Sequence, residues 1–318
     1  MPDYSDNKYV EKFRQADDKK KGLIILIVFL LLIFLILSGL IMLIPFLMVV
    51  VGIPIYMHQM KLKNQMQENF KANELEAILQ DAFPGATYDA RGDMIDADGC
   101  RECNLFPVTK HYCRTEDGLK MRFGNNNDIS MDYVEVYTYE IKTDSDGDDY
   151  EATLFKGGLF KYTFFKKFRD SIYIIPNETE NGKVKHGLFG GDKPLHNPSK
   201  YNKKLHKCEL DDVEFNEIFS IYSDNDEDVF YILTPQYMNI MKNLYNKYKN
   251  DIRFKFSDNY MYVAVSEMDL FDYDLVYAKG LKVDDVKTHE ACVEQTKKEL
   301  NSLVDFAKTL ELGDSIFY

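Results

Sequence analysis

The feature that most constrains this chain is an apolar run near its start. From Gly22 to Met57, 36 residues pass without a charged side chain, and nearly all of them are Leu, Ile, Val, Phe or Met. Roughly 20 helical residues span the hydrocarbon core of a bilayer, whereas a single helix of this length would measure about 54 Å. We therefore expect a transmembrane hairpin over residues 22–57, made of two short helices that turn near Ser38 and Gly39.

Basic side chains flank the run on both sides and decide its orientation. They are Lys8, Lys12, Arg14 and Lys19–Lys21 before the run, and Lys61, Lys63 and Lys71 after it. Because positive flanks stay in the cytoplasm, we expect a multi-pass protein of the cell inner (cytoplasmic) membrane, with both ends inside. A single tilted span, which would place one flank outside, stays open as the alternative.

The rest of the chain then divides into four parts. Residues 1–21 form a cytoplasmic arm, residues 22–57 the hairpin, and residues 58–85 a connecting helix that Pro84 and Gly85 end. Residues 86–318 form a cytosolic domain, in which a boundary between two lobes near 180–207 is left open. Five cysteines in the cytosol would stay reduced; with the single-span topology, Cys100 and Cys103 could instead form a disulfide.

The spacing of apolar residues predicts an α+β domain with a mixed, largely antiparallel sheet and a long C-terminal helix. Thr234 and Pro235 have the residue types of a helix N-cap and first helical position. The expected strands are 119–123, 133–142, 151–155, 159–168, 171–175, 229–233 and the hairpin 252–256 with 260–265; the expected helices are 210–221, 235–249 and 284–311.

The C-terminal helix carries a seam of residues that alternate by three and four positions. They are Val286, His289, Val293, Thr296, Leu300, Leu303, Ala307 and Leu310. Such a seam is typical of helices that pair with one another. A homo-oligomer formed through this helix is therefore one alternative for the function.

Cys100, Cys103, His111 and Cys113 form the sharpest group of candidate ligands. Two thiols spaced C-x2-C, followed by H-x-C, supply four side chains of the types that bind tetrahedral zinc. Zinc ribbons, however, usually repeat the C-x2-C pair or use a longer histidine spacing. A zinc-stabilised domain or a metal-dependent enzyme thus competes with three reduced thiols around a turn, and otherwise no cofactor is expected.

A lysine-rich loop stands out in a chain whose net charge is −13. Its lysines are Lys183, Lys185, Lys193, Lys200, Lys203, Lys204 and Lys207. Clustered cations near a bilayer bind anionic lipid, so membrane lipid is an expected partner, against the alternative of a solvated loop. Two acidic stretches, 144–151 and 224–228, lack the Gly and Glu positions of an EF-hand and are interpreted as solvated turns.

The sequence contains no recognised catalytic motif. Neither G-x-S-x-G nor H-E-x-x-H occurs, and we assign no catalytic residue. The pI near 5.0 argues against a nucleic-acid partner. We therefore expect a membrane-anchored binding or scaffolding protein that is not an enzyme.

Four stretches resemble the bacterial membrane proteins grouped as domain of unknown function 3137. They are the apolar hairpin, Phe155–Asn177 (FKGGLFKYTFFKKFRDSIYIIPN), Asp211–Met238 and Phe254–Asp272. The resemblance implies a shared fold and no catalytic residues. It also implies, as a conceivable partner, another membrane protein of the LemA type.

Overall fold

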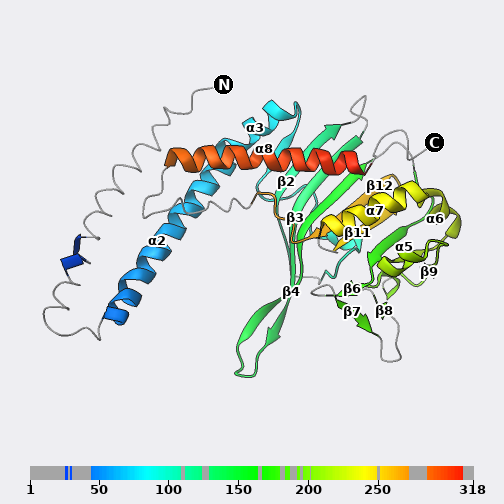
Figure 1. The fold of residues 1–318 in the computed structure, drawn as a ribbon, viewed down its shortest axis with the longest axis horizontal. Coiled ribbons are helices and arrows are strands. Elements are labelled where there is room, and N and C mark those ends of the chain that lie inside the picture. Colours follow the sequence, from blue (N-terminus) through cyan, green and yellow to red (C-terminus); the bar gives the residue numbers. More distant parts are fainter. Residues whose placement is uncertain are drawn as a thin grey trace. The chain divides into compact units, whose positions relative to one another are not determined.

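The computed structural model of this chain (Figure 1) describes twelve segments. They are residues 26–27, 29–30, 44–108, 112–123, 129–163, 167–179, 183–186, 192–193, 196–200, 202–248, 251–271 and 285–310. The chain divides into two compact units. The first comprises residues 1–74 and 273–295, and the second comprises residues 75–272 and 296–318.

Helix α2 (Ile44–Asn73) dominates the first unit and overturns the expected transmembrane hairpin. It runs unbroken from the apolar run into the polar segment that starts at His58, so only its first 14 residues, 44–57, are apolar throughout. Among the described residues, no helix combines the length and apolar character needed to cross a bilayer. The predicted hairpin and the predicted multi-pass location in the inner membrane are both wrong by this finding. The expected turn at Ser38 and Gly39 lies outside the described residues.

A nine-stranded sheet forms the centre of the second unit. Its order is β1 (Thr87–Asp89), β2 (Cys113–Phe123), β3 (Ile129–Thr143), β4 (Asp149–Thr163), β12 (Tyr260–Ser266), β11 (Ile252–Ser257), β5 (Ile172–Pro176), β10 (Phe219–Ser223) and β9 (His206–Cys208). Every neighbouring pair is antiparallel. The sheet is therefore antiparallel, and the expectation of a mixed sheet is wrong.

The central strands are buried along almost their whole length. Because successive side chains of a strand point to opposite faces, both faces of the sheet carry a core. On one face, Phe160 contacts Phe306 of α8 (Asp285–Thr309), with ring centroids 4.9 Å apart. Phe219 likewise contacts Tyr245 of α7 (Pro235–Lys247), at 5.3 Å. The opposite face packs against α4 (Ala97–Cys103) and the loop after it, where Phe106 stacks on Phe155 at 4.2 Å. Burial of this aromatic surface stabilises the sheet on both sides.

Several predicted elements are confirmed. Helix α7 begins at Pro235, and the Thr234 hydroxyl caps it by accepting a hydrogen bond from the Tyr237 amide. Strands β11 and β12 form the expected hairpin, in which Ser257 pairs with Tyr260 and Asp258 turns the chain with φ of 50°. The long C-terminal helix is α8.

Other elements differ from the prediction. Residues 226–232 form helix α6 (Asp226–Ile232) where a strand was expected. The predicted helix 210–221 is the shorter α5 (Val213–Ile218), which continues into β10. The two strands expected on either side of Gly157 and Gly158 are the single strand β4.

The remaining described elements are short. Helix α3 (Leu75–Ala82) precedes β1, and a three-residue 3-10 helix covers Pro198–Lys200. Strands β6 (Glu178–Thr179), β7 (Lys183–His186) and β8 (Asp192–Lys193) make a separate three-stranded antiparallel sheet.

Candidate functional site

The cysteines expected to bind zinc lie on α4 and at the start of β2. Cys100 and Cys103 are buried, whereas Cys113 is half-buried, and all three are free thiols. The Asp96 carboxylate caps α4 by accepting a hydrogen bond from the Gly99 amide, at 2.8 Å. The fourth expected ligand, His111, lies outside the described residues, so the zinc site at these four residues stays a prediction.

The surroundings of the two buried thiols, Cys100 and Cys103, favour their protonated form. The interaction with the Cys113 thiol and burial raise the pKa of Cys100 far above its ordinary value. Burial raises the pKa of Cys103 to about 11, although nearby Lys255 opposes the shift. The hydrogen bond with Cys100 lowers the pKa of Cys113. Of the three, Cys113 is therefore the thiol most readily deprotonated.

The lysines of the predicted lipid-binding loop do not form one continuous element. Lys183 and Lys185 lie on β7, and Lys193 lies on β8. Lys200, Lys203, Lys204 and Lys207 precede or lie on β9, with exposed side chains. Their binding to lipid stays a prediction.

Most of the described part of the C-terminal seam packs inside the chain, whereas Val293 is half-buried. Thr296, Leu300, Leu303 and Leu310 are buried, and so is Phe306 beside them, which contacts Phe160 and Tyr248. These side chains serve the sheet's own core and are not available to a second copy. The side chains of Val286, His289 and Ala307 lie outside the described part of the structure.

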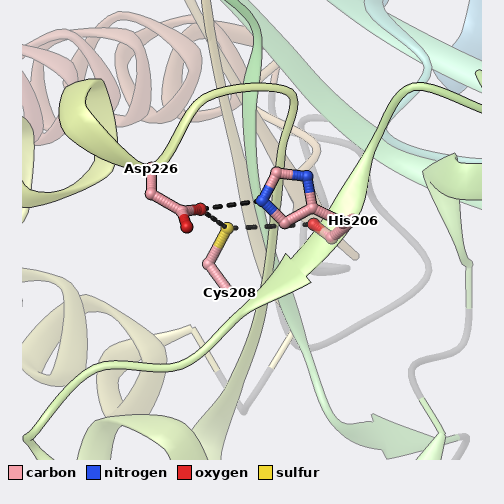
Figure 2. Close-up of side chains that lie close together, drawn as sticks. All are labelled: His206, Cys208 and Asp226. Carbon is pink, nitrogen blue, oxygen red and sulfur yellow. Dashed lines mark hydrogen bonds and ion pairs between the residues drawn. The ribbon is translucent and has the colours of Figure 1, made fainter.

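A second group of ligand-type side chains, which the sequence did not reveal, lies at the sheet edge (Figure 2). His206 Nε2 lies 2.8 Å from Asp226 Oδ1, and the Cys208 thiol donates to the same oxygen at 2.9 Å. One ligand atom from each of the three residues lies within 4.8 Å of the others. Successive side chains of a strand alternate between its faces, so the H-x-C spacing on β9 brings His206 and Cys208 to the same face.

The third residue, Asp226, is held beside β9 by the turn between β10 and α6. Strand β10 pairs with β9 through Ser223 opposite His206 and Ile221 opposite Cys208. The Ser223 hydroxyl donates to the Asn225 carbonyl and accepts from its amide, at 2.8 and 3.0 Å. These bonds fix the backbone one residue before Asp226, so Asp226 is held beside β9 while its side chain stays exposed.

The charges of this site follow from its hydrogen bonds. Burial, together with the Asp226 carboxylate, raises the pKa of Cys208 to about 12. Hydrogen bonds from Cys208 and His206 lower the pKa of Asp226. The Cys208 side chain is 7% exposed, whereas those of His206 and Asp226 are 51% and 57% exposed. The site is thus an ionised carboxylate that joins a buried thiol to an exposed imidazole.

Strands β3 and β4 also build an arm that extends beyond the rest of the sheet (Figure 1). β2 pairs with β3 only as far as Thr138, and β12 pairs with β4 only from Gly157 onward. From Glu140 to Thr143, the described pairing of β3 is with β4 alone. We call residues 140–151 the β3–β4 arm; all side chains from Ile141 to Glu151 are exposed.

A buried acid lies on β3, away from the arm. Glu135 Oε1 accepts hydrogen bonds from the amides of Leu270 and Phe271, at 2.9 and 3.2 Å. Burial, followed by the nearby carboxylates of Asp269 and Asp117, raises the pKa of Glu135 to about 9. Glu135 is therefore protonated in the folded chain near neutral pH.

Comparisons with known proteins add a family and little else. No curated protein matches the chain. Among solved structures, the crystal structure of the mycobacterial trehalose monomycolate transport factor A, TtfA, matches 73% of this chain and 94% of that chain. The identity is 7% and the TM-score is 0.35, and a likeness this distant carries no argument about activity.

The family match confirms the family named from the sequence, over a region that contains three of the four stretches on which the resemblance rested. Residues 153–312, half of the 318-residue chain, match the family described as "Protein of unknown function (DUF3137)". The matched region runs from β4 to the end of α8 and so includes the sheet centre and the His206, Cys208 and Asp226 group. The chain belongs to the DUF3137 family.

Proposed function

We propose that the protein is a binding or scaffolding protein without catalytic activity, and that it holds a cationic partner surface with the β3–β4 arm. The observation that carries the proposal is the arm itself: a two-stranded ribbon whose side chains are exposed from Ile141 to Glu151.

A ribbon of this kind contributes little to the stability of the domain. A two-stranded hairpin without a third strand or a covering helix is marginal in water, and the exposed arm buries little apolar surface. Ile141 and Tyr150 are large apolar side chains that the arm leaves in solvent. A partner that covers them would gain the apolar burial that the chain alone does not obtain.

The charge of the arm indicates the kind of partner. Six carboxylates oppose one lysine, which gives a local charge of −5. The acidic residues are Glu140, Asp144, Asp146, Asp148, Asp149 and Glu151. Such a surface attracts a positively charged partner and raises its association rate in a salt-dependent manner.

The turn at the tip keeps its shape without all of these carboxylates. Asp144 Oδ1 accepts from the amides of Asp146 and Asp148, both at 2.9 Å, and Gly147 adopts φ of 90°. The carboxylates of Asp146 and Asp148 are therefore not needed for the turn. We expect the hairpin to form when both residues are replaced by residues of opposite charge.

The test is site-specific photo-crosslinking of the full chain in its own cells. A photoreactive amino acid at Ser145 is expected to capture a discrete basic protein, and the double change Asp146→Lys and Asp148→Lys is expected to abolish capture. The control places the same amino acid at exposed Glu209. Equal capture from Glu209, or capture that survives the charge reversal, would refute the proposal. A LemA-type protein, which the family resemblance favours, is the first captured band to look for.

A further inference from the structure

We propose that His206, Cys208 and Asp226 form a binding site for a divalent cation of the zinc class. The proposal is independent of the β3–β4 arm. It rests on the donor types, on their positions and on the way the fold holds them.

The donor types select the ion. A thiolate, an imidazole nitrogen and a carboxylate oxygen are the three kinds of ligand that proteins use for zinc, with bonds of about 2.3, 2.0–2.1 and 2.0–2.2 Å. Calcium and magnesium require sets of oxygen ligands, and a buried sulfur is a poor donor to either. The thiolate and imidazole therefore favour zinc and its chemical relatives cobalt and nickel.

The positions fit such an ion after small movements. Ligand atoms of a tetrahedral ion with these bond lengths lie about 3.3–3.7 Å from one another. In the structure, Asp226 Oδ1 lies 2.8 Å from His206 Nε2 and 2.9 Å from Cys208 Sγ, with all three atoms within 4.8 Å. The two contacts of Asp226 need to open by less than about 1 Å, and the separation of His206 and Cys208 needs to close by about 1.5 Å at most. Rotation of the exposed His206 and Asp226 side chains supplies this without a change of the backbone.

The backbone holds the three residues together before any ion arrives. His206 and Cys208 lie on one strand, two residues apart, and the paired strand β10 leads through the Ser223–Asn225 turn to Asp226. Asn225 Nδ2 further donates to Asp170 Oδ2 at 3.0 Å. Because the backbone is already ordered, ion binding costs mainly the rotamer entropy of the exposed His206 and Asp226 side chains.

Binding exchanges protons for the ion. The Cys208 thiol, which now donates to Asp226, releases its proton to solvent and forms the sulfur–metal bond as a thiolate. The imidazole of His206 keeps one proton on Nδ1 and binds through Nε2. The carboxylate of Asp226, freed of both hydrogen bonds, binds through Oδ1. The −2 charge of thiolate and carboxylate balances the divalent ion.

The fourth position of the ion faces solvent. His206 and Asp226 are each about half exposed, whereas Cys208 is buried below them. Zinc in proteins can be bound by three side chains, with water in the fourth coordination position. We infer a single ion per chain at the edge strand β9.

The test titrates the purified full-length chain, kept reduced with a phosphine, with Co²⁺ and then with Zn²⁺. Co²⁺ bound to a thiolate absorbs through sulfur-to-metal charge transfer, so the spectrum identifies cysteine ligation directly. We expect one Co²⁺ per chain with this absorption and its displacement by Zn²⁺. The changes Cys208→Ser and His206→Ala are each expected to weaken binding on the order of 100-fold or more, since loss of a ligand costs at least as much as loss of a supporting residue.

The matched control distinguishes this site from the cysteines near α4. Cys100→Ser and Cys113→Ser are expected to leave the Co²⁺ spectrum and affinity unchanged. His206→Ala alters an exposed side chain and so leaves the fold intact, as circular dichroism will show. Absence of a thiolate spectrum in the unaltered chain would overturn the proposal. So would a spectrum that survives both Cys208→Ser and His206→Ala, or one that Cys113→Ser abolishes.

Discussion

Replacing Glu135 by Gln should make the folded chain more stable than the unaltered chain, by a margin that grows as the pH rises. Glu135 is 7% exposed, and its pKa in the folded chain is about 9, against an ordinary value of 4.5. Between these values the folded chain holds a proton that the unfolded chain has lost. Stability therefore falls with rising pH in this window, by about 1.4 kcal/mol per pH unit. Glutamine does not titrate and resembles the protonated acid in shape.

The magnitude follows from the window that an experiment can cover. From pH 5 to pH 7 the unaltered chain should lose about 2–3 kcal/mol relative to Glu135→Gln. The Gln carbonyl can accept from the amides of Leu270 and Phe271 as Glu135 does, at 2.9 and 3.2 Å. Its amide group can donate toward Asp269, whose carboxylate helps to raise the pKa of Glu135.

Urea unfolding of both proteins at pH 5, 6, 7 and 8 measures the difference. The two free energies of unfolding should be similar at pH 5 and diverge in favour of Glu135→Gln at higher pH. Glu135→Ala serves as the control: it leaves two buried amides without an acceptor and should destabilise at every pH. A difference between the unaltered chain and Glu135→Gln that stays constant from pH 5 to 8 would show that Glu135 is ionised throughout.

Three further predictions concern the core and the helix ends. Leu244→Ala on α7 removes a buried side chain, and the cavity it leaves should lower the free energy of unfolding by about 2–5 kcal/mol. Urea unfolding measures this loss. A loss below about 1 kcal/mol would mean that α7 does not pack as described. Gly157→Ala places a methyl group against the backbone of Val265 on β12. This crowding should lower the free energy of unfolding by about 1–3 kcal/mol and with it the melting temperature. An unchanged melting temperature would argue against this close approach of the two strands. Thr234→Ala removes the side-chain cap that receives the Tyr237 amide and should cost about 1 kcal/mol, with Thr234→Ser as the control that retains most of it.

The sequence predicted the elements whose local signals agree with their packing. The Thr-Pro start of α7 and the turn at Asp258 are examples, because cap and turn chemistry acts within a few residues. The prediction of a strand at residues 229–233 was wrong because it relied on the strand propensity of Val, Phe, Tyr and Ile. Two local signals nevertheless favour the helix: the Asn225 side chain caps it, and three acids fill its first turn.

The candidate sites were harder to predict because their members are distant in the sequence. Asp226 follows Cys208 by 18 residues, and only the pairing of β9 with β10 brings them together. The H-x-C spacing at His206 was a usable signal, since the same spacing at His111 had indicated a ligand pair. The acids 224–228 were interpreted as a solvated turn, and for Asp226 a local pattern offered no reason to assign another role.

The position of β11 and β12 in the sheet has a consequence for how the chain folds during synthesis. Strands β4 and β5 are separated by eight residues in the sequence, 164–171, yet the β11–β12 hairpin lies between them in the sheet. A ribosome must therefore add residues 252–266 before the sheet can close at its centre. Until then β4 and β5 each present an unpaired edge, which is the kind of surface on which nascent chains associate wrongly. Contacts over so long a separation also form slowly, so we expect the middle of this sheet to close later than the β2–β3–β4 meander, whose strands are neighbours in the sequence.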